Sequence, residues 1–248
     1  MAKRVAVVLS GCGRQDGSDP AETLFALLVL ERAGAQAVCA APDRLQPAVV
    51  DHLTAAVDTA PRKIRAEAAR LVGRSVAPLG VLDARKLDGL IVPGGEGAVT
   101  TLSDYATKHE LCTVDPELFA LLRGLLQARR PMGFIGLSAL LAARVLGPVA
   151  GVRLTLGARG TAPAKHAAIM GADVRPGTTD DVVADQKSRV YSTPGLLAQP
   201  ASPEPASVEP ARTLPAVARA IDQLVRMVVG GGAQPRPVIK PKDPQRVL

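Results

Sequence analysis

The sequence predicts an α/β protein whose mostly parallel central sheet is covered by helices on both faces. Three observations lead to this prediction. The 248 residues are 47% hydrophobic, enough to bury a sizeable core. Short, uniformly apolar runs recur along the chain, and most of them precede a segment of helical periodicity. Strands that are apolar throughout are typical of parallel sheets, because neither face of such a sheet meets water.

Each predicted strand is a short run rich in Val, Ile, Leu or Ala that ends at Gly, Pro or Ser. The runs are residues 5–9, 37–41, 90–92, 132–135, 152–156 and 190–192.

The clearest helix is predicted from Pro20 to about Ala33. Asp19 supplies a capping side chain, Pro20 takes the first helical position, and Glu22 follows the cap by three residues. Gly34 then ends the helix. Further helices are predicted at residues 62–72, 116–128, 138–145, 162–170 and 217–229.

The domain organisation follows from the prolines and the charges. We expect one domain over residues 1–230, with a Pro-rich loop at 199–215 before the last helix. Residues 231–248 form a predicted disordered basic tail. The formal net charge is +7, and the tail carries +3 of it from four cationic residues and one aspartate, so the body is only mildly basic. The tail could contact nucleic acid or an acidic partner weakly, in a salt-sensitive way.

Cysteine usage indicates a reducing compartment. Cys12, Cys39 and Cys112 are an odd number, without a CxxC motif or zinc-site spacing. The first apolar run is shorter than a signal-peptide core, and no stretch approaches the roughly 20 apolar residues of a membrane span. We therefore expect a cytoplasmic protein without a membrane segment, a metal or a cofactor.

Ligands of open parallel sheets bind beyond the carboxyl ends of the strands, so the turns after the strands are candidate sites. Three turns supply candidate pocket residues: Gly11 and Cys12; Gly94, Gly95 and Glu96; and Gly136, Leu137 and Ser138. Gly-rich turns leave backbone N–H groups free for an anion or a developing oxyanion. A tight turn alone also accounts for the glycines, and no turn matches the P-loop or GxGxxG spacing.

An ordered series of motifs resembles the ElbB family (enhancing lycopene biosynthesis protein 2) of the PfpI and class I glutamine amidotransferase-like superfamily. The match covers most of residues 3–198 and resumes in the last helix. Its pieces include Val8-Leu9-Ser10-Gly11-Cys12-Gly13, Asp51-His52-Leu53-Thr54, Leu90-Ile91-Val92-Pro93-Gly94-Gly95, Cys112-Thr113-Val114-Asp115, Pro131-Met132-Gly133-Phe134 and Ser192-Thr193-Pro194.

The resemblance implies a flavodoxin-like, doubly wound fold and a glyoxalase of modest activity linked to isoprenoid production. It also implies an elbow cysteine that attacks a small carbonyl compound, a glutamate beside it, and a homodimer. The glutamate maps to Glu22 and the cysteine to Gly136. Glycine offers no thiolate and cannot form a covalent intermediate. We therefore expect the family's glyoxalase activity to be absent.

Two functions fit these residues. The first is a catalytically degenerate ElbB-like protein that binds a small molecule or has a regulatory role. The second is an active small-carbonyl lyase or hydrolase that uses Cys12, or Glu22 and Glu96 as general acid and base. Glu22 could instead reach back to its helix cap. Ser138 is expected to bond its own backbone rather than to attack a substrate.

The pocket's charge is expected to differ from the family pattern. Glu96 stands where the family carries phenylalanine, and Thr100 and Thr101 stand where it carries lysine and asparagine. These changes predict a neutral or cationic small ligand, or none. A carboxylate at Glu96 is also expected to raise the pKa of its neighbour. His52, His109 and His166 are scattered in the sequence and are predicted to be surface or loop residues.

Overall fold

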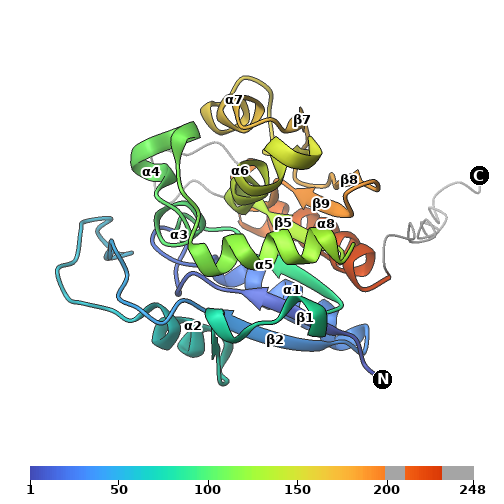
Figure 1. The fold of residues 1–248 in the computed structure, drawn as a ribbon. Coiled ribbons are helices and arrows are strands. Elements are labelled where there is room, and N and C mark those ends of the chain that lie inside the picture. The colour runs from blue at the N-terminus through green and yellow to red at the C-terminus, as the bar shows by residue number, and fades with distance from the viewer. Residues whose placement is uncertain (199–209, 231–248) are drawn as a thin grey trace, which may run out of the picture.

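The computed structural model describes residues 1–198 and 210–230, and a seven-stranded sheet forms its centre (Figure 1). The strands of this sheet are β1 (Arg4–Val8), β2 (Gln36–Ala41), β3 (Ala77–Pro78), β4 (Gly89–Val92), β5 (Met132–Ile135), β8 (Val183–Asp185) and β9 (Val190–Thr193). Their order is β3-β2-β1-β4-β5-β9-β8, and every pair is parallel except β8 with β9. The predicted doubly wound, mostly parallel fold is confirmed.

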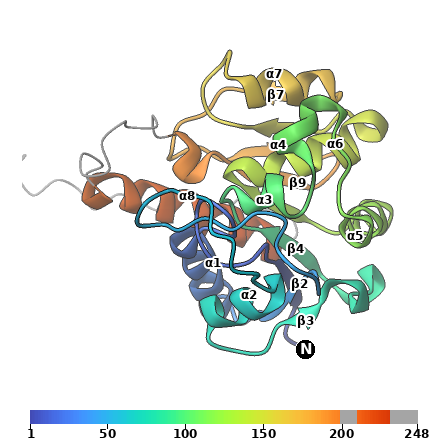
Figure 2. The same ribbon diagram turned by 90° about the vertical axis from the view of Figure 1, so that its left-hand side faces the viewer.

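Helices cover both faces of the sheet. Figure 2 shows α1 (Pro20–Arg32) and α8 (Pro210–Gly230) on one side, and α5 (Pro116–Gln127) and α6 (Ala139–Ala150) on the other. Successive side chains of a strand point to opposite faces. Accordingly, Val5 and Val7 of β1 join the core layer under α1 and α8, whereas Ala6 and Val8 join the layer under α5 and α6.

The remaining elements are short or peripheral. The other α-helices are α2 (Ile64–Val72), α3 (Gly97–Thr100), α4 (Tyr105–Lys108) and α7 (Ala162–Ile169). The 3₁₀ turns are η1 (Leu79–Val81), η2 (Ala84–Lys86), η3 (His109–Leu111), η4 (Gly136–Ser138) and η5 (Gly195–Ala198). A separate two-stranded parallel sheet contains β6 (Arg153–Thr155) and β7 (Asp173–Arg175). Within the described ranges, no helix has both the length and the apolar character needed to cross a membrane.

The start and end of α1 lie where the sequence predicts them. The Asp19 side chain accepts the backbone N–H of Glu22 at 3.1 Å, and Pro20 occupies the first turn, where a missing N–H costs nothing. Gly34 follows the helix with a φ of +66°, a left-handed conformation that glycine adopts without strain.

The prediction for the C-terminal region is partly wrong. A loop was expected over 199–215, but α8 already begins at Pro210. Proline is favourable at the first helical position, so Pro210 starts the helix, and Pro215 within it forgoes one backbone hydrogen bond. The rest of the predicted loop, residues 199–209, and the predicted tail, residues 231–248, lie outside the described residues.

Candidate functional site

The sharp turn after β5 is centred on Gly136, which connects the strand to η4 and α6. Gly136 has a φ of +59°, in the left-handed region. A Cβ atom built on it would lie 3.5 Å from the Pro194 carbonyl oxygen, 3.7 Å from Gly94 Cα and 3.8 Å from Leu197 Cβ. These are ordinary van der Waals distances. The turn therefore has the form of a nucleophile elbow, with room for a side chain at position 136.

A small cavity of about 60 Å³ opens beside Gly136, about the volume that two water molecules occupy in the liquid. It is lined by Arg14, Asp19, Glu22, Gly95, Glu96, Gly136, Leu137, Leu196 and Leu197. These residues lie in the segments that follow β1, β4, β5 and β9. They meet at the carboxyl ends of the central strands, where the topology of the sheet predicts a ligand site.

Glu22 connects three of these segments. Its side chain is 1% exposed; Oε2 accepts the N–H of Gly94 at 2.9 Å, and Oε1 accepts the N–H of Leu196 at 2.7 Å. Both oxygens therefore face loops far along the chain, and the cap of α1 is held by Asp19 instead. A Cβ on Gly94 or Gly195 would overlap the Glu22 carboxyl, so both positions require glycine.

The pKa of Glu22 is raised to about 8, mainly by burial and also by the nearby Asp19 carboxylate. The two backbone N–H bonds and the Arg14 guanidinium act in the opposite direction. Glu96 is not among the causes of this shift. At neutral pH the group is therefore mostly a neutral carboxylic acid, which can donate a hydrogen bond as well as accept one.

The charge of the cavity differs from the expectation. Thr100 and Thr101 do not line it; they line a separate, larger hollow with Arg44. The cation that the sequence analysis missed is Arg14, whose Nη2 donates to the Leu196 carbonyl oxygen at 3.2 Å. Glu96 is exposed at the cavity. Loss of surrounding water raises its pKa, while Arg14 and His52 lower it. The cavity thus combines one guanidinium with three carboxyl groups.

Cys12 and Gly11 do not line the cavity, contrary to the expectation that their turn opens onto it. Cys12 lies instead within the electrostatic reach of α2. Burial, Glu67 and Asp16 raise the pKa of its thiol, and Arg70 and Arg62 lower it. The net upward shift keeps the thiol protonated and weakens it as a nucleophile.

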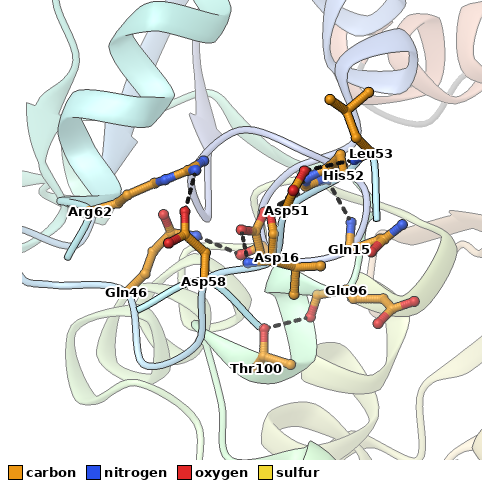
Figure 3. Close-up of polar contacts among 11 residues, drawn as sticks. Gln15, Asp16, Gln46, Asp51, His52, Leu53, Asp58, Arg62, Glu96 and Thr100 are labelled. Atoms are coloured by element: carbon orange, nitrogen blue, oxygen red, sulfur yellow. Dashed lines mark hydrogen bonds and ion pairs between the residues drawn. The ribbon is translucent and has the colours of Figure 1, made fainter. Parts of the chain in front are cut away.

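A polar cluster fixes the turn that carries Cys12 and Arg14 (Figure 3). Asp16 Oδ2 accepts the Val50 N–H at 2.9 Å, and Gln46 Nε2 donates to the Asp16 carbonyl oxygen at 2.8 Å. The Gln15 N–H donates to His52 Nε2 at 3.3 Å. These bonds anchor the β1–α1 turn to residues 46–52, a surface segment far from it in sequence.

Ser138 has the structural role that was predicted for it. Its hydroxyl is fully buried and accepts the Ile135 N–H at 2.9 Å. The carbonyl oxygens of Val92 and Ile135 both lie 2.8 Å from it, and either can accept its single proton. Neither Ser138 nor Gly94 lines the cavity directly, although Gly94 holds Glu22 in it. Leu137, Gly95 and Glu96 do line it, as expected.

Two of the three histidines are not scattered in space. The ring centroids of His109 and His166 lie 5.2 Å apart, and the Tyr105 hydroxyl oxygen is 2.8 Å from His166 Nδ1. Neither histidine lines the Gly136 cavity. In the part of the chain that the structure describes, no cluster of three or more His, Cys, Asp or Glu side chains could hold a metal ion.

Leu196 and Leu197 follow β9, and the sequence-based prediction places candidate residues only in the turns after β1, β4 and β5. The apolar run at 190–192 was itself predicted, so the same rule would have found them. Arg14 stands in a turn that was singled out, but composition alone does not show where its long side chain reaches.

A parallel sheet whose central strand turns sharply into a helix, beside a buried glutamate from the first helix, defines a protein of the class I glutamine amidotransferase-like fold. No protein-family model matches the chain. Curated relatives do match. Among them, the human glutamine amidotransferase-like class 1 domain-containing protein 3, mitochondrial, is 35% identical over 211 residues, covering 81% of this chain and 77% of its own. The ES1 protein homolog, mitochondrial, of Rattus norvegicus is 34% identical over 79% of this chain and 76% of its own.

The crystal structure of an isoprenoid biosynthesis protein with an amidotransferase-like domain from Ehrlichia chaffeensis matches with a TM-score of 0.79 and 26% identity, covering 92% of this chain and 99% of that one. A ThiJ/PfpI domain protein from Brachyspira murdochii, 15% identical with a TM-score of 0.51, shares the fold. The chain belongs to the ElbB/ES1 family of the DJ-1/PfpI, class I glutamine amidotransferase-like superfamily.

Proposed function

We propose that this chain is a degenerate member of its family that binds a small carbonyl compound without covalent chemistry. The observation that carries the proposal is the combination at the elbow. Gly136 has the left-handed φ of an elbow residue but no side chain, while Glu22 is present and accepts the N–H groups of Gly94 and Leu196. Loss of a nucleophile typically costs several powers of ten in rate even when the rest of the site remains.

The cavity supports a small, polar, uncharged ligand. Its volume of about 60 Å³ limits an enclosed ligand, or the enclosed part of one, to very few heavy atoms, and glyoxal, with four, is the smallest dicarbonyl. A protonated Glu22 can donate a hydrogen bond to a carbonyl oxygen, and Arg14 offers further donors. The Ehrlichia relative is described as an isoprenoid biosynthesis protein, and we extend that association, in a regulatory capacity, to this chain.

A second candidate is an active lyase or hydrolase that uses Glu22 and Glu96 as acid and base. It is favoured by one observation: both side chains line the same cavity, and the pKa of each is raised, which brings a carboxyl closer to the range useful at neutral pH. The version of this mechanism that depends on Cys12 has less support, because Cys12 lies outside the cavity and its thiol pKa is raised.

The test is turnover of glyoxal and methylglyoxal by the purified protein and by Gly136→Cys. We expect the wild type to be inactive and Gly136→Cys to gain activity. Gly151→Cys is the matched control: Gly151 has a φ of +57° and open space around it, so the variant adds the same thiol and a similar backbone strain outside the cavity. Wild-type activity that Glu22→Gln abolishes would favour the acid–base enzyme, and activity lost in Cys12→Ser would favour a role for that thiol.

Binding is measured separately by isothermal titration of the wild type with methylglyoxal. Saturable binding without turnover supports the proposal. Absence of binding together with no gain of activity in Gly136→Cys would overturn it.

The remaining sequence expectations stay proposals. The two curated relatives are named mitochondrial, whereas a cytoplasmic location was expected for this chain, and cell fractionation distinguishes the two. Analytical ultracentrifugation tests the expected homodimer. A pull-down with and without residues 231–248, at low and high salt, tests the expected contact of the basic tail with acidic partners.

A further inference from the structure

A second cavity lies between α5 and α6, two helices that Figures 1 and 2 both show side by side. Its volume is about 520 Å³, in the range of small-molecule sites and far larger than the cavity at Gly136. The lining residues are Cys112, Thr113, Val114, Pro116, Phe119, Arg123, Arg144, Val145 and Pro148.

The walls of this cavity are mainly apolar. The apolar lining residues are Val114, Pro116, Phe119, Val145 and Pro148. Phe119, one of only three phenylalanines in the chain, is 45% exposed. An aromatic side chain left in water in a concave site is a surface that an apolar ligand would cover, with a gain in free energy.

Two arginines supply the only full charges among the described residues that line this cavity. Arg123 has no hydrogen bond or ion pair with any described residue. Arg144 donates its Nε–H to the Cys112 carbonyl oxygen and pairs with no described carboxylate. By contrast, Arg44, across the same 113–116 segment, bonds Asp115 at 2.7 Å. Two guanidinium groups without a carboxylate, in a site with apolar walls, leave positive charge available for a ligand.

We propose that the cavity between α5 and α6 binds a small amphipathic anion. The ligand has one apolar chain, which lies against Phe119 and the neighbouring valines and prolines, and one carboxylate or phosphate headgroup, which Arg123 and Arg144 hold. This site is separate from the elbow and does not depend on the function proposed for Gly136.

The test is isothermal titration of the full chain with octanoate and octyl phosphate, each below its micelle concentration. Octanol and octyltrimethylammonium share the chain without the negative charge, and inorganic phosphate shares the charge without the chain. We expect saturable binding of one or both anions, at least about ten-fold tighter than the other three compounds. The tighter of the two anions identifies the headgroup. Affinity should rise about four-fold for each methylene added, until the cavity is full.

Arg123→Gln should weaken binding of the anion about ten-fold or more, because it removes a charge-assisted donor. Arg159→Gln is the matched control, an exposed arginine on the loop after β6 with the same change in net charge. Phe119→Ala tests the apolar wall independently and should also weaken binding. Thermal unfolding of each variant establishes that it is folded. Binding of octanol as tight as that of the anions, equal affinities of Arg123→Gln and Arg159→Gln, or no saturable binding of either anion would overturn the proposal.

Discussion

Replacing Glu22 by glutamine tests whether the buried carboxyl keeps its proton in the folded protein. Its pKa is about 8 in the fold, against an ordinary value of 4.5. Between these values the unfolded chain releases the proton and the folded chain retains it. The free energy of unfolding therefore falls as pH rises, by about 1.4 kcal/mol per pH unit from this group. The contribution is fully present below the ordinary pKa and is lost by the time the pH passes the folded value, a total of roughly 5 kcal/mol.

Glu22→Gln cannot ionise, so it removes this pH dependence. It also turns an amide NH₂ toward the backbone N–H of Gly94 or Leu196, a constant loss of about 1–3 kcal/mol. We expect the wild type to be the more stable protein near pH 5 and to lose that advantage toward pH 9, as measured by urea unfolding at several pH values. Glu31→Gln, an exposed position on the same helix, controls for the loss of one carboxyl. A stability difference between wild type and Glu22→Gln that stays constant from pH 5 to pH 9 would refute the reasoning.

Three further outcomes are expected. Gly94→Ala should lower the free energy of unfolding by about 2 kcal/mol or more, because the new Cβ overlaps the Glu22 carboxyl. Gly34→Ala, in open space, should lower it by only about 1 kcal/mol, because of its positive φ. Equal losses of the two variants on thermal unfolding would contradict this. Ser138→Ala should lower the free energy of unfolding by about 1–3 kcal/mol, because it leaves the buried Ile135 N–H unpaired. Methylglyoxal binding should stay unchanged. A loss of binding without a loss of stability would instead assign the hydroxyl to the ligand site. Cys12 should react more slowly with iodoacetamide at neutral pH than a free thiol does, because its pKa is raised, and an equal rate would argue against that shift.

The sequence predicts the long, regular parts of this fold well, because buried parallel strands and capped helices leave strong local patterns. It does not reveal β3, β7 and β8, which have two or three residues each and carry polar or turn-forming side chains. Such strands form because the sheet beside them offers hydrogen bonds, and that is a tertiary effect. The position of β6 in a separate sheet could not be predicted either, since its apolar run resembles a central strand.

The candidate site is predictable only in part. The glycine turns and Glu22 stand out by composition and by family resemblance. The partners of Glu22 do not, because its two carboxyl oxygens accept N–H groups 72 and 174 residues further along the chain. The expectation that Cys12 faces the cavity failed for a related reason. A turn places its residues on two sides, and this turn is held by hydrogen bonds that Gln46 and Val50, 30 and 34 residues further along the chain, donate to Asp16.

The Glu22 carboxyl has a consequence for comparing relatives of this protein. Because it fills the space next to Gly94 and Gly195, any larger residue at either position displaces a buried acid that joins three loops. Selection for folding alone would preserve all three residues, whatever residue occupies the elbow. Retention of this trio in a relative is therefore a sign of architecture and does not by itself indicate catalysis.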